Sequence, residues 1–157
     1  MLDEEGRTRL ESAYRAVGDD LWRAILAFAG GRRAVADDAV AEAFAQAARR
    51  LRSIHDLRAW TFRAAFRIAA GEMQRTRTAS AGVAEIVAHD DVTLTDYLDL
   101  TEALSPSQRR VFILRDLMGY PGAETAALLG TSEIAVRVHL HAARKRLRGA
   151  LEEEVVS

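Results

Sequence analysis

The stretch GYPGAETAALLGTSEIAVRVHLHAARKRLR, residues 119–148, determines the fold class of the last third of the chain. Pro121 opens a short helical segment that ends at Leu129, residues 130–132 (Gly-Thr-Ser) form a tight turn, and residues 133–148 have helical periodicity. A short helix, a turn of about three residues containing glycine and a longer second helix make a helix-turn-helix. The sequence therefore predicts this motif, with the small Ala126 where its two helices cross.

The second helix of the motif has two distinct faces. A buried stripe is expected at Val136, Leu140, Ala143 and Leu147. At about 100° per residue, the opposite face carries Ile134, Val138, His141, Ala142 and Lys145. That face would enter the major groove of DNA, with Arg137 reading a guanine edge and Lys145, Arg146 and Arg148 holding phosphates. The candidate DNA-binding residues are Ser132, Arg137, His141, Arg144, Lys145 and Arg148.

Ile134 and Val138 are unusual members of a face that meets DNA, because both are apolar and β-branched. Two interpretations stay open. The two side chains contact thymine methyl groups, or they belong to a surface that packs on another protein.

Upstream of this motif, apolar periodicity predicts three amphipathic helices in residues 8–28, 35–51 and 56–75. The first helix has its stripe at Leu10, Tyr14, Val17, Leu21, Ile25 and Phe28, and Gly30-Gly31 ends it. Asp56 is the expected N-cap of the third helix. These three helices are sufficient for one small domain.

Residues 76–92 are rich in Thr, Ser, Ala, Gly and acids and are predicted to be a linker. A short helix is expected over residues 95–104. Ser105-Pro106-Ser107-Gln108 then has the sequence of a capping box with proline at the first helical position. Since no strand pattern occurs, the predicted fold is all-α: two small helical domains joined by a flexible acidic linker, the C-terminal one a helix-turn-helix.

Charge is strongly segregated along the 157 residues, although the net charge is only −1. Residues 53–77 carry five arginines against two acids, residues 78–104 carry six acids and no base, and residues 105–148 carry eight bases against three acids. Each run alone is explained by a solvated face. Two basic blocks around an acidic one suggest two modules that bind a polyanion.

Other function classes are excluded or disfavoured by composition and spacing. The absence of cysteine excludes disulfide frameworks, thiol catalysis and cysteine zinc sites. His139 and His141 point about 200° apart on a helix, so no metal site is expected. Without a phosphate-binding loop or a nucleophile with a base, we expect neither a cofactor nor enzymatic activity. The acidic N-terminus and the lack of a long apolar run favour a cytoplasmic protein with no membrane span.

The chain resembles the extracytoplasmic-function group of bacterial RNA polymerase sigma factors. Residues 104–109 (LSPSQR), Gly119-Tyr120, Glu124-Thr125-Ala126, residues 129–132 and the helix from Val136 to Arg148 resemble region 4 of these factors, which binds the minus-thirty-five promoter element. Residues 36–44 (ADDAVAEAF) resemble the region 2 signature. Asp38, Glu42 and Phe44 match that signature, and Ala41 stands where glutamine is usual.

The resemblance implies specific partners and roles. Residues 1–77 would be region 2, residues 78–93 the linker and residues 94–157 region 4. Asp38, Glu42 and Phe44 would bind the clamp helices of the largest subunit of core RNA polymerase, and the polymerase flap is a further implied contact. Residues 60–75 resemble the helix that grips the minus-ten element, and residues 53–58 occupy the position of the loop that captures a flipped base. Arg58, Arg63, Arg67 and Arg75 are the candidate residues for that DNA.

The acidic linker has two interpretations: a segment that lines a basic polymerase channel, as in the family, or a solvated tether. An anti-sigma factor is a further implied partner. Two alternatives to a sigma factor remain. One is a sigma-like interaction protein that binds polymerase or a regulator without sequence-specific promoter recognition. The other is a helix-turn-helix repressor, for which the signature in residues 36–44 has no explanation.

Overall fold

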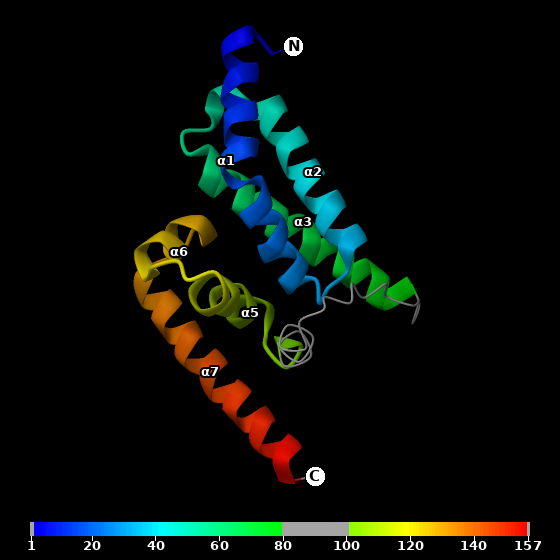
Figure 1. Cartoon of the computed structure of the whole chain (residues 1–157), viewed down its shortest axis with the longest axis vertical. Coiled ribbons are helices and arrows are strands. Elements are labelled where there is room, and N and C mark those ends of the chain that lie inside the picture. Colours follow the sequence, from blue (N-terminus) through cyan, green and yellow to red (C-terminus); the bar gives the residue numbers. More distant parts are fainter. Residues whose placement is uncertain (1, 80–100, 157) are drawn as a thin grey trace.

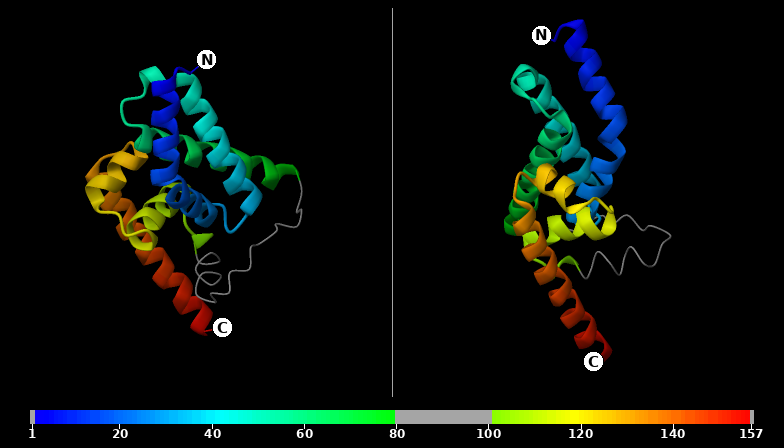
Figure 2. Two further views of the ribbon diagram at one scale, coloured as in Figure 1. Left: turned by 45° about the horizontal axis from the view of Figure 1, so that its top comes forward. Right: turned by 90° about the vertical axis from the view of Figure 1, so that its left-hand side faces the viewer.

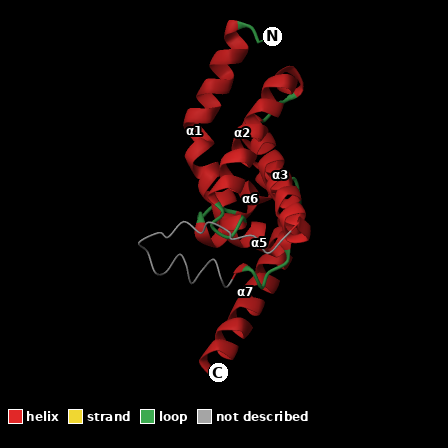
Figure 3. Cartoon of the chain, turned by 90° about the vertical axis from the view of Figure 1, so that its right-hand side faces the viewer, coloured by secondary structure: helices red, strands yellow, loops and turns green. Residues whose placement is uncertain are grey.

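The computed structural model describes residues 2–79 and 101–156, and its regular elements within these ranges are helices (Figures 1 and 3). In chain order they are α1 (Glu4–Phe28), α2 (Arg33–Arg50), the single turn η1 (Leu51–Ser53), α3 (Leu57–Ala79), α5 (Pro106–Phe112), the wide turn η2 (Ile113–Leu117), α6 (Gly122–Leu129) and α7 (Glu133–Val156). The all-α fold with a C-terminal helix-turn-helix is confirmed. Most of the predicted linker (78–93) and of the short helix over 95–104 lies outside the described residues.

Helix ends follow local capping chemistry. The Asp3 carboxylate accepts a hydrogen bond from the Gly6 amide at 2.8 Å, and Asp56 accepts one from the Ala59 amide at 3.1 Å. At the start of α5, Ser105 and Gln108 form both bonds of the predicted capping box. The helices are longer than predicted at four ends: α1 begins at Glu4, α2 begins at Arg33, α3 continues to Ala79 and α7 to Val156.

The helix predicted after Ser105 widens in its second half. Over Ile113–Leu117 the backbone forms a π-type turn, and the Met118 amide donates to the Ile113 carbonyl at 2.8 Å. Gly119, at φ +76°, then reverses the chain, and the Arg115 guanidinium donates to the Tyr120 carbonyl at 2.7 Å. This turn directs Ile113 and Leu114 away from α7 and into the main core.

The main apolar core joins both halves of the chain. Helices α1, α2 and α3 contribute most of it, including Leu21, Ile25, Phe62 and Phe66. Ile113, Leu114 and Leu128 from the C-terminal half are buried in the same cluster. Figure 2 shows α6 beside the start of α3 and α5 beneath the end of α1. The two domains therefore pack together rather than standing apart.

The helix-turn-helix also has a core of its own. Ala126, Val136, Leu140, Ala143 and Leu147 are buried there as predicted, together with Leu104, Val111 and Phe112 from α5 and its approach. Gly130 has the left-handed conformation (φ +67°) that the turn requires. Val136 is 1% exposed, so the orientation of α7 is fixed by its buried stripe.

One aromatic position differs from the sequence prediction. Tyr14 was expected in the buried stripe of α1 but is 58% exposed, because it lies edge-on to Phe44, with ring centroids 5.2 Å apart, at the margin of the core. Trp22 is half-buried, packs against the core and donates its indole N–H to Asp37 at 2.8 Å. None of the described helices combines the length and apolar character needed to cross a bilayer.

Leu114→Ala tests the shared core. The side chain is fully buried in a cluster formed mainly by α1–α3, so its truncation should destabilise the chain by about 2–5 kcal/mol. Both tryptophans, Trp22 and Trp60, belong to the N-terminal half, and their fluorescence during urea unfolding therefore reports that half alone. We expect the midpoint they report to fall. An unchanged midpoint would mean that the halves are not coupled.

Candidate nucleic-acid and protein interfaces

The exposed acids of α2 form the candidate protein interface. Asp38 and Glu42, one turn apart, both point into solvent. Glu42 accepts hydrogen bonds from the Gln46 amide at 3.0 Å and from the Arg49 guanidinium at 3.2 Å, and these bonds hold its pKa below the ordinary value. Glu42 is thus ionised and already faces a guanidinium of its own chain.

Glu72 of α3 lies against the same acidic surface. Burial, and then the nearby charge of Asp38, raise the pKa of the Glu72 carboxyl, which Arg75 partly opposes. The Glu72 Oε2 atom is buried without a hydrogen-bond partner among the described residues. Two like charges that Arg75 compensates only in part favour a cationic ligand at this surface.

Phe44, the third residue of the signature, is buried at 7% exposure and packs against Tyr14. It therefore contributes to the core and does not present its ring at the surface. Its structural contribution is to hold α2 against α1, so that the exposed acids keep their direction.

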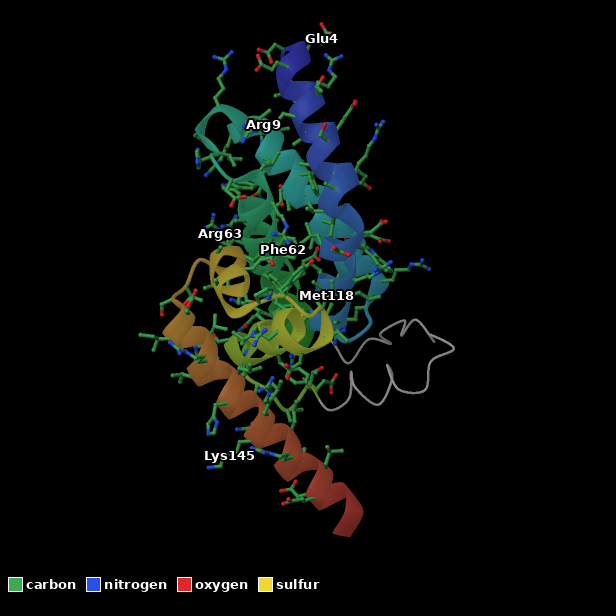
Figure 4. The ribbon with its side chains drawn as sticks, turned by 60° about the vertical axis from the view of Figure 1, so that its left-hand side comes forward. Glu4, Arg9, Phe62, Arg63, Met118 and Lys145 are labelled. Carbon is green, nitrogen blue, oxygen red and sulfur yellow. The ribbon has the colours of Figure 1, made fainter. Side chains whose placement is uncertain are left out.

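The loop after α2 is held by Arg9 of α1 (Figure 4). The Arg9 guanidinium donates to the carbonyls of Leu51 at 3.1 Å, Ile54 at 2.7 Å and His55 at 3.4 Å. Beside this loop lies an open hollow lined by Leu2 and residues 48–53, including Arg49, Arg50 and Arg52. The loop that carries the candidate flipped-base site is therefore braced from one side and flanked by positive charge.

Arg9→Met tests this bracing. The substitution keeps the aliphatic stem but removes the donors to three loop carbonyls, so the loop should open more often. Hydrogen–deuterium exchange of amides in residues 51–56 should accelerate, whereas the exposed Arg7→Met, on the same helix, should leave it unchanged. Equal exchange in both variants would show that packing of Leu51 and Ile54 alone fixes the loop.

The four candidate arginines of α3 have different environments. Arg63 and Arg67 are exposed, and Arg67 donates to the Gln46 side chain at 3.3 Å. Arg63 lies beside the turn of the helix-turn-helix (Figure 4), and a Cβ atom on Gly130 would stand only 2.9 Å from its Cδ. Arg75 is exposed beside Glu72. The structure therefore does not give these side chains a single open surface.

Arg58 was expected outside and is instead half-buried between the two domains. Its Nη1 atom lies 2.6 Å from Oε1 of Glu124 on α6, and its guanidinium lies over the rings of Tyr120 and Phe62 at 5.2 and 5.9 Å. Burial opposes its charge, but the hydrogen bonds to Glu124 and Tyr120 outweigh this cost and raise its pKa. Arg58 thus serves the domain interface in this arrangement.

Tyr120 completes that interface. Its ring meets Phe62 edge-on, and its hydroxyl donates to the Asp20 carboxylate at 3.2 Å. Burial, followed by the charge of Asp20, raises the pKa of Tyr120, so the hydroxyl remains a donor at neutral pH. Both Tyr120 and Glu124 belong to the stretch that resembles region 4, and no local pattern indicates their partners in the other half of the chain.

The predicted groove-facing side of α7 is exposed, with Lys145 projecting away from α1–α3 (Figure 4). Arg137, His141, Lys145 and Arg148 are all exposed, and Ala142 is half-buried. Ser132 accepts from the Ala135 amide at 3.1 Å and so caps the helix. Arg144 differs, because it donates twice to Asp116, at 2.9 and 2.6 Å, and these bonds raise its pKa. Arg144 therefore also fixes α7 to η2.

Comparison with known proteins supports the same architecture. Residues 94–147 match the family model described as Sigma-70, region 4. No curated protein sequence matches the chain. The structure is similar to that of CnrH in complex with the cytosolic domain of CnrY, with 23% identity, a TM-score of 0.72, and 94% of this chain and 90% of that chain covered. It is also similar to the sigma factor RpoE from Bartonella quintana, solved with the anti-sigma factor NepR, with 22% identity, a TM-score of 0.72, and 90% and 96% of the two chains covered.

These findings concern both halves of the molecule. The family match covers the α5–α7 unit, which carries the helix-turn-helix, and the structural likeness extends over α1–α3 as well. Residues 94–147 therefore match the region 4 family model, and the chain as a whole shares the fold of these two solved proteins.

Proposed function

We propose that the chain is a cytoplasmic sigma factor of the extracytoplasmic-function group, which binds core RNA polymerase and directs promoter-specific transcription initiation. The observation that carries this proposal is the combination of a region 4 match in residues 94–147 with a sigma-factor fold over nearly the whole chain. Such a role is regulatory and asks for no catalysis by the chain. In this proposal residues 1–77 act as region 2, residues 78–93 as the linker and residues 94–157 as region 4.

The acidic surface of α2 is the proposed polymerase contact. Asp38 and Glu42 are exposed on adjacent turns, and burial followed by repulsion from Asp38 raises the pKa of the neighbouring Glu72. Basic side chains of the polymerase clamp helices would relieve this repulsion and replace Arg49 as the partner of Glu42. Phe44 supports the contact from within the core.

The minus-ten contact is proposed along α3 and its preceding loop. Extracting a base from the stack costs a few kcal/mol, so a capture site needs a firm loop and cations for the single strand. Arg9 provides the bracing, and Arg49, Arg50 and Arg52 line the hollow next to the loop. Arg63, Arg67 and Arg75 would follow the strand along α3.

Arg58 requires a rearrangement before it can contact DNA. Its partners Glu124 and Tyr120 come from the C-terminal domain, so release of Arg58 is coupled to separation of α6 from α3. A half-exposed ion pair contributes only about 1 kcal/mol or less, which a polyanionic ligand readily replaces. We infer that polymerase and promoter bind a more open arrangement of the two domains.

The minus-thirty-five contact is proposed for the exposed side of α7. Arg137 lies early in the helix, where recognition helices approach base edges, and Lys145 and Arg148 lie where phosphates are reached. Ser132 and His141 border this surface, and Arg144 would contact phosphate only after exchanging its bonds with Asp116.

An anti-sigma factor is a further proposed partner. One solved structure of similar fold is the sigma factor RpoE in complex with the anti-sigma factor NepR, and another is CnrH in complex with the cytosolic domain of CnrY. Because this chain shares their fold, an anti-sigma factor is the expected class of inhibitor.

Transcription in vitro tests the function. Purified chain added to core RNA polymerase on a library of genomic DNA should produce transcripts whose start sites share upstream minus-ten and minus-thirty-five sequences. Assembly with core enzyme without any specific transcript would instead support the interaction protein without promoter recognition.

Charge reversal tests the polymerase contact. Asp38→Arg with Glu42→Arg should abolish co-elution with core enzyme in size-exclusion chromatography, because cations would then face the cations of the clamp. Glu152→Arg, an exposed acid near the end of α7, is the matched control and should assemble normally. Assembly that survives the double reversal would remove α2 from the interface.

Alanine substitutions separate base reading from phosphate binding on α7. Arg137→Ala should relax base preference in the minus-thirty-five element by about 1–3 kcal/mol, since a bidentate pair to guanine discriminates by this amount. Lys145→Ala should weaken binding to all sequences and reduce the salt dependence by about one counterion. Competition binding of the holoenzyme to duplexes at several salt concentrations measures the base preference and the salt dependence. Arg7→Ala on α1 is the control. Equal losses of affinity on every sequence in both variants would contradict this assignment of the two roles.

A further inference from the structure

Two aliphatic side chains stand in the middle of the basic surface of α7. Ile134 is 67% exposed and Val138 is 60% exposed, which places them among the few large apolar residues that the described chain leaves in solvent. They lie one helical turn apart on the same side of the helix. Neither residue belongs to the core that holds α7, because α7 packs through Val136, Leu140, Ala143 and Leu147 on its other side.

Isoleucine and valine at these exposed positions lower the stability of the helix. β-branched residues lose side-chain freedom in a helix and have lower helix propensity than alanine. Because both positions are exposed, packing within the chain does not offset this loss of helix stability, and contact with a ligand would. The helix start is independently secured by the Ser132 cap, so neither residue is needed to set the direction of α7.

The surroundings of the pair favour DNA over protein as that ligand. Arg137 and His141 are exposed next to it, and Lys145 and Arg148 continue the positive surface. Two side chains are far below the roughly 800 Å² per partner that a stable protein interface buries. A polyanion with small apolar spots fits better, and duplex DNA presents such spots as the thymine C5-methyl groups of its major groove.

We propose that Ile134 and Val138 are specificity-determining residues that contact the methyl groups of two thymines in the minus-thirty-five element. Four residues of helix rise by roughly 6 Å, whereas adjacent base pairs are separated by about 3.4 Å. The two methyl groups therefore lie about two base steps apart, and Arg137 reads a guanine edge close to them. The proposal rests on the proposed function and adds the apolar half of its base recognition.

The test uses thymines that differ only by the methyl group. Duplexes are first selected from a random pool by the holoenzyme, and each thymine of the minus-thirty-five sequence is then replaced singly by deoxyuridine, which keeps base pairing. At two positions the affinity should fall about fourfold, the ratio that corresponds to about 0.8 kcal/mol for one buried methylene-sized group. Ile134→Ala should abolish the effect of deoxyuridine at one position and Val138→Ala at the other.

Controls separate this proposal from the function on which it rests. Lys145→Ala should weaken binding but keep both deoxyuridine effects, and circular dichroism should show that the two alanine variants remain helical. Failure of the holoenzyme to select any sequence would contradict the proposed function itself. Selected sequences whose affinity ignores deoxyuridine, or variants that keep the full deoxyuridine effect, would overturn the methyl contacts alone. Loss of polymerase assembly in Ile134→Ala, without a deoxyuridine effect, would overturn them in favour of a protein contact.

Discussion

The packing of Phe28 at the end of α1 is the constraint on which the arrangement of the two domains depends. Its ring is 2% exposed and meets Phe66 of α3 edge-on, with ring centroids 5.3 Å apart. The guanidinium groups of Arg109 and Arg110 from α5 lie over the same ring at 5.7 and 5.4 Å, and Arg109 donates to the Phe28 carbonyl at 3.2 Å. The last turn of α1 carries no basic residue, so Arg109 supplies from the other domain the positive charge that a helix C-terminus favours. Helices α1, α3 and α5 thus converge at one residue.

Two kinds of contact join the halves of the chain, and they differ in how readily a ligand can replace them. Arg109, 5% exposed, also donates to the carbonyls of Thr101 at 3.0 Å and Glu102 at 3.4 Å, and removal of its guanidinium would leave buried acceptors without a donor. The Arg58–Glu124 pair is partly hydrated and therefore cheap to replace. In the proposed function, separation of the two halves would break the buried contacts of Arg109 and the shared apolar core, whereas the Arg58–Glu124 pair is the contact that DNA can replace.

Local features of the fold could be predicted from the sequence because their causes are local. The capping box at Ser105, the glycine turn at Gly130 and the buried stripe of α7 each depend on residues within a few positions of one another. The domain interface could not be predicted in this way. Arg109 and Phe28 are 81 positions apart, and Tyr120 and Asp20 are 100 apart, so no periodicity connects them. The environment of Arg58 was misjudged for the same reason: its exposure depends on α6, an element that only the tertiary fold brings near.

The two proposed DNA surfaces differ in exposure: the one on α7 is open to solvent, and the one on α3 is partly covered. On α7 the side chains of Arg137, Ile134 and Val138 are exposed in the packed arrangement, so that surface needs no rearrangement to meet a duplex. On α3, Arg58 is engaged by Glu124 and Tyr120, and Arg63 lies against the turn at Gly130. The helix that would be held by the minus-thirty-five element is also part of the unit that covers the start of α3. In the proposed function, the duplex element therefore binds α7 without separation of α6 from α3, whereas Arg58 reaches a single strand only after that separation.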